Sequence, residues 1–209
     1  MGIVEKILTL ACAAGIALQS QEIVDVHSHI LPSEYIANLK QHNALMDEGF
    51  PLPKYDAETH LKWMDEAGIR ISVLTMAAPQ PSFGDAAENA AVIRRVNEIA
   101  ATLKREHPGR FLFCAALPQS DVKAAVSEIE YAFDVLHADG VKLATNVGGQ
   151  YLGSPELDPL MDVLDKRKAV VILHPHRPEP ISKKVMNQTP LAMQAQTYSH
   201  SGGLCRRCR

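Results

Sequence analysis

The sequence predicts an α/β fold, a (β/α)8 TIM barrel of which about five βα units are present in this chain. Five apolar segments alternate with amphipathic ones, as expected for a parallel sheet whose strands are connected by helices. The first apolar segment ends in His27 and His29, and the fifth ends in His174. Barrel strands end at one common mouth, so these side chains can converge there. A doubly wound sheet is the alternative, and the histidines favour the barrel.

In the first half of the chain, strand and helix signals alternate as this fold requires. Alternating β-branched and polar residues predict a strand at 22–27, and the spacing of Leu61 and Met64 predicts a helix at 57–67. Gly68 closes that helix, as glycine commonly does. The other elements expected here are a helix at 34–42, a loop at 49–53, a strand at 69–76 and a proline-rich loop at 80–84.

The second half continues the alternation. A long helix at 85–106 is expected to end before Pro108 and Gly109, and Ser120 is expected to be the N-cap of the next helix. Pro155 opens the last helix, because its missing N–H costs nothing at the first helical position. The other elements expected here are strands at 111–117, 141–144 and 169–174, a helix from 120 to about 139, a glycine-rich loop at 145–153 and a helix end near 168.

The composition of the chain excludes several classes of protein. Hydrophobic residues make up 46% of the 209 residues, which is enough to bury the core of one domain. A net charge of −3 and a pI near 6.3 provide no basic surface, so nucleic acid is not an expected partner. No apolar run reaches the roughly 18 residues that span a bilayer. Four cysteines are too few and too unevenly placed for a disulfide scaffold.

The N-terminus has two interpretations. Residues 7–18 form an apolar segment as long as the core of a secretory signal, followed by a small polar segment. Residues 1–20 are therefore expected to be a signal peptide cut near Ser20, which would make the protein periplasmic or secreted. The alternative is an amphipathic or buried N-terminal helix in a cytoplasmic protein.

Several ordered motifs resemble one enzyme group, the amidohydrolase superfamily, and in particular its branch containing aminocarboxymuconate-semialdehyde decarboxylase. The resemblance spans about residues 22–190 and is more specific than a lone pair of histidines. The residues that carry it are those at 24–32, 64–69, 97, 107–111, 116–118, 140–146, 151–159 and 173–176.

The resemblance implies a metal-dependent enzyme. His27, His29 and His174 match the family's metal ligands, and the implied cofactor is a divalent metal, most often zinc. The implied reaction is decarboxylation, a carbon–carbon lyase activity, or hydrolysis of a small carboxylate-bearing substrate. Thr145 and Asn146 follow the fourth strand, where side chains contact substrate in this fold. His176 is a further candidate for substrate contact, although an ordinary loop histidine is the alternative.

Asp25 lies two residues before His27, and a regular strand would place both side chains on one face. A carboxylate there could orient an imidazole, since ligating histidines usually bond a carboxylate or carbonyl. The alternative is a buried polar residue in the lower layers of the barrel.

The family also has an acid–base histidine after its sixth strand and a metal-binding aspartate after its eighth, and neither can be placed in this sequence. Only 35 residues follow His174, whereas three more strand–helix units need roughly 90. We therefore expect residues 21–195 to be the N-terminal part of a barrel and 196–209 to be an atypical tail. The alternative function is a truncated fragment without turnover and with at most weak metal binding. The expected partner is a small-molecule substrate, and formation of a homo-oligomer is left open.

Overall fold

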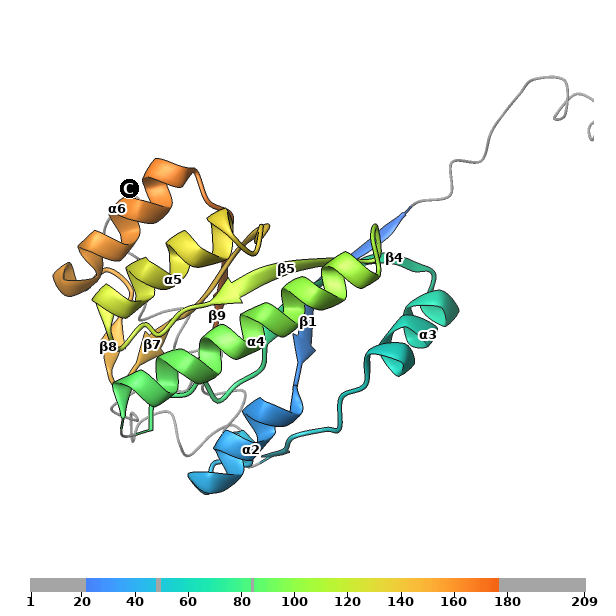
Figure 1. The fold of residues 1–209 in the computed structure, drawn as a ribbon, viewed down its shortest axis with the longest axis horizontal. Coiled ribbons are helices and arrows are strands. Elements are labelled where there is room, and N and C mark those ends of the chain that lie inside the picture. Colours follow the sequence, from blue (N-terminus) through green and yellow to red (C-terminus); the bar gives the residue numbers. More distant parts are fainter. Residues whose placement is uncertain (1–21, 48–49, 84, 177–209) are drawn as a thin grey trace, which may run out of the picture.

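The computed structural model describes residues 22–47, 50–83 and 85–176, and five parallel strands form its main sheet (Figure 1). Their order along the sheet is β1 (Ile23–Ile30), β4 (Ile69–Met76), β5 (Phe111–Ala116), β6 (Gly140–Ala144) and β9 (Val171–His174). This order follows the chain without the reversal that defines a doubly wound sheet. The sheet is the curled, barrel-type half sheet that the sequence predicts. The expected signal peptide at 1–20 and tail at 196–209 lie outside the described residues.

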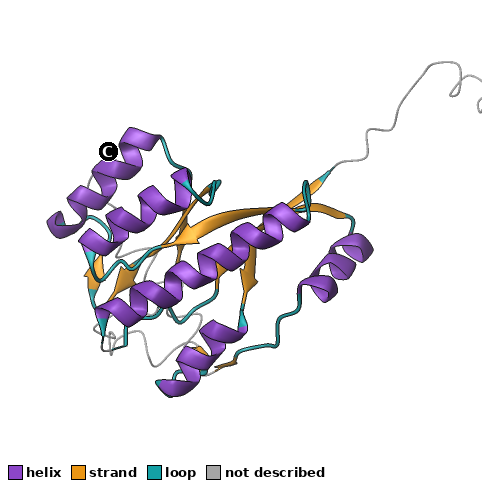
Figure 2. Cartoon of the chain, in the orientation of Figure 1, coloured by secondary structure: helices purple, strands orange, loops and turns teal. Residues whose placement is uncertain are grey.

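Helices connect successive strands and cover the sheet (Figure 2). They are α2 (Ser33–Gln41), α3 (Ala57–Ala67), α4 (Ala86–Glu106), α5 (Val122–Asp134) and α6 (Asp158–Arg167), the last preceded by the short 3-10 helix η1 (Pro155–Leu157). One buried apolar cluster joins α2, α3 and α4 to strands β1, β4 and β5, and a second joins α5 and α6 to β6. None of the helices within the described ranges is long and apolar enough to cross a membrane.

Local chemistry explains where these helices begin and end. Gly68 follows α3 with φ of 70°, the left-handed conformation that glycine adopts without strain. The predicted N-cap of α5 was wrong by one residue. Asp121, rather than Ser120, accepts a hydrogen bond from the backbone N–H of Ala124 at 3.0 Å. Both residue types are good N-caps, so residue type alone does not separate them.

Short strands occupy 50–51, 146–147 and 150–151, within segments that the sequence predicted as loops, and a further short strand at 46–47 was not predicted. Strands β2 (Met46–Asp47) and β3 (Phe50–Pro51) pair with each other, as do β7 (Asn146–Val147) and β8 (Gln150–Tyr151). Between β7 and β8, Gly148 and Gly149 have φ of 58° and 78° and form a two-residue turn. A Gly-Gly pair is typical of such turns, but two-residue strands are too short to show an alternating pattern.

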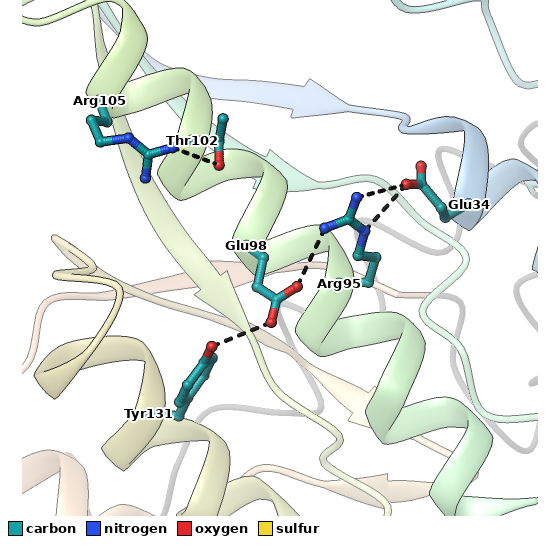
Figure 3. A network of polar contacts seen from close by, with 6 residues as sticks. All are labelled: Glu34, Arg95, Glu98, Thr102, Arg105 and Tyr131. Atoms are coloured by element: carbon teal, nitrogen blue, oxygen red, sulfur yellow. Dashed lines mark hydrogen bonds and ion pairs between the residues drawn. The ribbon is translucent and has the colours of Figure 1, made fainter.

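Polar contacts on the surface link α4 to its neighbours (Figure 3). Arg95 of α4 donates to Glu34 of α2 at 3.1 Å and to Glu98 at 3.4 Å. Glu98 accepts from the hydroxyl of Tyr131 on α5 at 3.2 Å. Exposed pairs of this kind contribute about 0–1 kcal/mol each, so the buried clusters beneath them account for most of the packing energy.

The sheet is tightly packed at the start of β6. A Cβ on Gly140 would lie 2.7 Å from the carbonyl oxygen of Val170 and 3.0 Å from the sulfur of Cys114. Glycine within a strand often marks such close approach of another backbone. The absence of a side chain here allows β6 to lie against β9, and it thereby helps to place the strand that carries His174.

Candidate metal centre

Three histidines converge on the concave face of the sheet. The Nε2 atom of His29 lies 3.0 Å from that of His27 and 3.2 Å from that of His174. All three possible ligand atoms lie within 4.8 Å of one another. Imidazole nitrogens that share one ion at about 2.1 Å are separated by similar distances, so the three residues fit a metal ion.

A β-bulge in β1 helps to aim this cluster. Asp25 pairs with Ser72 and Ser28 pairs with Leu74, so β1 has one more residue than β4 in this interval. A bulge of this kind changes the face onto which later side chains point. Asp25 therefore shares a face with Ser28 rather than with His29.

The prediction that Asp25 shares the histidine face was wrong, because it assumed a regular strand. The Asp25 carboxylate instead accepts the backbone N–H of His27 at 3.0 Å and lies 3.5 Å from the Ser72 hydroxyl. It supports the bulged backbone and makes no hydrogen bond to an imidazole of the cluster among the described residues.

Thr75 of β4 fixes the tautomer of His29. Its hydroxyl donates to the carbonyl oxygen of Ser28 at 3.0 Å and lies 2.8 Å from Nδ1 of His29. Since the hydroxyl proton is used on Ser28, the Thr75 oxygen accepts from Nδ1–H. The Nε2 atom of His29 is then left with a lone pair that faces the other two histidines.

A carbonyl oxygen plays the same part for His174. Nδ1 of His174 lies 3.0 Å from the carbonyl oxygen of Pro175, which can only accept a hydrogen bond. Nδ1 therefore carries the proton and Nε2 presents its lone pair. Partners of this kind commonly set the orientation and tautomer of ligating histidines.

Burial keeps two of the three imidazoles neutral. Burial lowers the pKa of His29 to about 4 and that of His174 to about 2, and the nearby positive charge of Lys142 acts in the same direction. Both imidazoles are therefore uncharged near neutral pH. Metal ions bind the neutral form of histidine, so these groups need lose no proton to act as ligands.

The predicted substrate residues lie beside the cluster. Two of them, Thr145 and Asn146, bind the backbone of the segment that follows β9. Thr145 is 7% exposed, and its hydroxyl accepts the backbone N–H of His176 at 3.0 Å. Asn146 is 2% exposed, and its amide contacts the carbonyl oxygen of His176 at 3.5 Å. These contacts fasten the segment after β9 to the end of β6. A role for Thr145 and Asn146 in substrate binding remains a prediction.

The ring of His176 lies beside that of His174. Its ring centroid lies 5.7 Å from that of His174, and burial lowers its pKa to about 3. Its Nε2 atom is buried and has no hydrogen-bond partner within the described part of the chain. A role for His176 in substrate contact stays a prediction.

Two neighbours of the cluster were missed by the sequence analysis. Thr75 looks like an ordinary β-branched strand residue, and only the pairing of β1 with β4 brings it to His29. Lys142 did carry a signal, because a lysine inside an apolar strand is rarely buried without a reason. In the structure it is 0% exposed and its Nζ donates to the carbonyl oxygen of Met76 at 2.8 Å.

Curated relatives of this chain are decarboxylases. Decarboxylase yanB of Aspergillus niger is 37% identical over 158 residues, which span 73% of this chain and 43% of that protein. The 6-methylsalicylic acid decarboxylase of Penicillium expansum is 32% identical over 184 residues, which span 86% of this chain and 56% of that protein. The chain thus spans about half the length of these relatives.

Solved structures and a family model agree on the fold. A crystal structure of an amidohydrolase II matches with a TM-score of 0.78 and 31% identity, covering 85% of this chain and 60% of that one. A 5-carboxyvanillate decarboxylase from Novosphingobium aromaticivorans, crystallised with manganese, matches with a TM-score of 0.73 and 19% identity, covering 83% and 56%. The amidohydrolase family model matches residues 24–197. The chain belongs to the amidohydrolase family.

Proposed function

We propose that this chain provides the metal-binding part of a metal-dependent decarboxylase that acts on a small aromatic carboxylate. The observation that carries the proposal is the convergence of the Nε2 atoms of His27, His29 and His174 on one point. The similarity to decarboxylases, among them a 6-methylsalicylic acid decarboxylase, favours decarboxylation over hydrolysis.

Four residues at this point have roles in the proposed reaction. His27, His29 and His174 would hold a divalent ion, which when bound polarises the oxygen atoms of a carboxylate-bearing substrate. Thr75 keeps the lone pair of His29 directed at the ion. Loss of CO2 leaves an electron pair on the ring carbon, which must then take up a proton. We assign no described residue to that proton transfer.

The metal is part of the proposal. Three imidazoles suit zinc, the ion expected from the sequence, and also iron, nickel and copper. Manganese is the ion named for the 5-carboxyvanillate decarboxylase of similar fold. We propose zinc for this chain and expect it to bind more tightly than manganese, because manganese prefers oxygen ligands. Competitive titration of the metal-stripped chain with the two ions would measure the order of affinity.

The activity is tested by incubating the purified chain with zinc or manganese and 6-methylsalicylate or 2,6-dihydroxybenzoate, and following CO2 and the phenolic product. We expect product formation that stops with a chelator and in His174→Ala. The matched control is His137→Asn, at an exposed histidine with φ of 55°, a conformation that asparagine tolerates. CO2 release that persists in His174→Ala would contradict the proposal.

A second candidate is a chain that binds metal without turnover. It is favoured by the composition of the centre, because the described residues place three imidazoles there and no carboxylate among the possible ligands. Catalytic metal sites often include a carboxylate ligand beside histidines. Stoichiometric zinc binding that is lost in His174→Ala, together with no product from either acid, would establish this second candidate.

A further inference from the structure

Ser28 lies between two of the candidate metal ligands, and its side chain points away from them. His27 and His29 face the concave side of the sheet, where their Nε2 atoms lie 3.0 Å apart. The Oγ atom of Ser28 instead lies 3.3 Å from Nε2 of His60, which belongs to helix α3 on the other face. The bulge between Asp25 and Ser28 gives β1 this arrangement. Position 28 therefore connects the segment that carries two ligands to a helix.

The imidazole of His60 is held among aromatic rings. Its centroid lies 5.3 Å from that of Phe111, 5.9 Å from that of Tyr55 and 6.4 Å from that of Trp63. The residue is half-buried. An apolar side chain would pack in such a setting without the cost of removing polar nitrogens from water. The hydrogen bonds of its ring nitrogens are therefore what histidine adds at position 60.

Both ring nitrogens of His60 have a hydroxyl partner. Nε2 lies 3.3 Å from Oγ of Ser28, and Nδ1 lies 3.4 Å from the hydroxyl oxygen of Tyr55. Burial lowers the pKa of His60, so the ring is neutral near neutral pH, with one nitrogen that donates and one that accepts. Because a hydroxyl group can donate or accept, both contacts form at once in either tautomer. The two contacts fix the position of the ring relative to β1.

The backbone of Ser28 connects this contact to the metal centre. Its carbonyl oxygen accepts the hydroxyl proton of Thr75, and the Thr75 oxygen accepts Nδ1–H of His29. The carbonyl of Ser28 must keep its direction if this tautomer of His29 is to be held. A bulge disrupts the regular ladder of strand hydrogen bonds, so the backbone at Ser28 has fewer constraints from its neighbouring strand. The side-chain contact with His60 supplies one from the opposite face.

We propose that His60 is a positioning residue of the metal centre, which acts through its hydrogen bond to Ser28. It holds the bulged backbone so that His27 and His29 keep their Nε2 atoms directed at one point. The inference rests on the proposed function, because the residues that His60 positions are the proposed metal ligands. His60 itself does not contact the ion in this arrangement.

The test measures zinc affinity and folding stability separately. Competition with a chromogenic chelator gives the zinc affinity of the 209-residue chain, and urea denaturation of the metal-free chain gives its free energy of unfolding. His60→Leu removes both ring nitrogens, whereas His60→Gln keeps a polar atom near the position of Nε2. Ser28→Ala removes the same contact from β1, and it replaces His60→Leu if that variant does not fold. The control is His107→Leu, because His107 also packs on Phe111, with centroids 5.8 Å apart, and is not the partner of Ser28.

We expect His60→Leu and Ser28→Ala each to weaken zinc binding about tenfold, as loss of a group that orients ligating histidines does. His60→Gln should stay within about threefold of the unmodified chain and His107→Leu within about twofold. The double variant of His60→Leu and Ser28→Ala should bind zinc no more weakly than either single variant, because both remove one contact. A role in stability alone would lower the free energy of unfolding and leave the zinc affinity of the folded chain unchanged.

Four results would overturn the assignment of His60. They are unchanged zinc affinity in His60→Leu or in Ser28→Ala, an equal loss in His60→Leu and His60→Gln, losses that add in the double variant, and an unmodified chain that binds no zinc. The proposed function fails separately, if zinc binding depends on His60 as expected but the zinc-loaded chain releases no CO2 from either test acid. That outcome would leave the positioning role supported.

Discussion

Thr75 shows how a single hydroxyl can set the chemistry of a metal ligand. Its proton goes to the Ser28 carbonyl, and its oxygen receives the Nδ1 proton of His29. Valine has nearly the same shape as threonine but offers neither bond. With valine at position 75, the imidazole of His29 would be free to take the other tautomer, which places a proton where the lone pair is needed.

We therefore predict that Thr75→Val weakens zinc binding by about tenfold, the lower end of the effect seen when partners of ligating histidines are removed. Competition with a chromogenic chelator would measure the affinity. Thr102→Val is the matched control, because the Thr102 hydroxyl lies on α4 and, among the described residues, bonds only Arg105 of the same helix (Figure 3). Equal zinc affinity in Thr75→Val and the unmodified chain would contradict the assignment of the tautomer.

Glu128 is a buried carboxylate away from the metal centre. Its side chain is 4% exposed and accepts from Arg94 at 2.9 Å and from Asn97 at 2.8 Å. Burial raises the pKa of this carboxyl above its usual value, although Asn97 and Arg94 act in the opposite direction. A carboxyl with a raised folded pKa binds its proton more tightly in the folded chain than in the unfolded chain. Its contribution to stability is therefore present below the unfolded pKa and is lost as pH rises through the folded pKa.

The corresponding prediction concerns Glu128→Gln, which carries no titrating group. Relative to this variant, the unmodified chain should lose free energy of unfolding as the pH rises through the range above the usual glutamate pKa. Urea denaturation of both proteins across this range would measure the difference. Glu130→Gln, at an exposed position on the same helix, should show no such trend. A difference that is flat, or that favours the unmodified chain as pH rises, would show the inferred direction to be wrong.

At the scale of elements, Asn97 connects a helix to the end of a strand. Its side-chain amide donates to the carbonyl of Ala116 at 2.9 Å and its oxygen accepts the N–H of Ala116 at 2.9 Å. The residue is 2% exposed. Ala116 ends β5, so these bonds continue the sheet's hydrogen bonding into α4. The same amide also bonds Glu128 of α5.

We predict that Asn97→Ala destabilises the chain by about 2–4 kcal/mol, because it leaves both backbone groups of Ala116 and the Glu128 carboxylate without their partner. The measurement is urea denaturation at neutral pH. Thr102→Ala, on the same helix, should change the free energy of unfolding by less than about 0.5 kcal/mol. A loss below about 1 kcal/mol in Asn97→Ala would mean that water replaces these bonds.

The long elements could be predicted from the sequence, and the short ones could not. Helix α3 has the predicted bounds because its apolar spacing and Gly68 agree on its end. Strand β1 runs to Ile30, three residues beyond the expected end, because its pairing with β4 continues to Met76. Hydrogen bonding between strands sets that boundary, and the alternation of residues along β1 does not show how far the pairing with β4 extends.

The same limit applies to the centre. The three histidines could be found because each ends a predicted strand, and a barrel brings strand ends together. The positions of Asp25, Thr75 and Lys142 depend on a bulge, on register and on the reach of a side chain across the sheet. Those features arise from pairs of strands and cannot be read from one strand at a time.

At the scale of the whole molecule, the centre joins the two outermost strands of the described sheet. His27 and His29 lie on β1, and His174 lies on β9, at the opposite end of the strand order. The sheet must curl for His29 and His174 to come within 3.2 Å, although they are 145 residues apart in the sequence. A metal ion bound by all three would hold the two ends of the sheet together, and it could do so only in the folded chain.

Zinc should therefore stabilise the whole fold. At a free zinc concentration of about 100 times the dissociation constant, linkage gives about 2.7 kcal/mol. For a chain of this size that corresponds to a rise in the melting temperature of about 5–10 °C. Calcium should have no comparable effect, because it prefers oxygen ligands. Thermal unfolding followed by circular dichroism, with zinc, calcium or a chelator, would measure these shifts. The zinc effect should disappear in His174→Ala, because the ion would then contact β1 alone. If His174→Ala kept the full shift, the ion would be bound within one strand, and the two ends of the sheet would be held by packing rather than by metal.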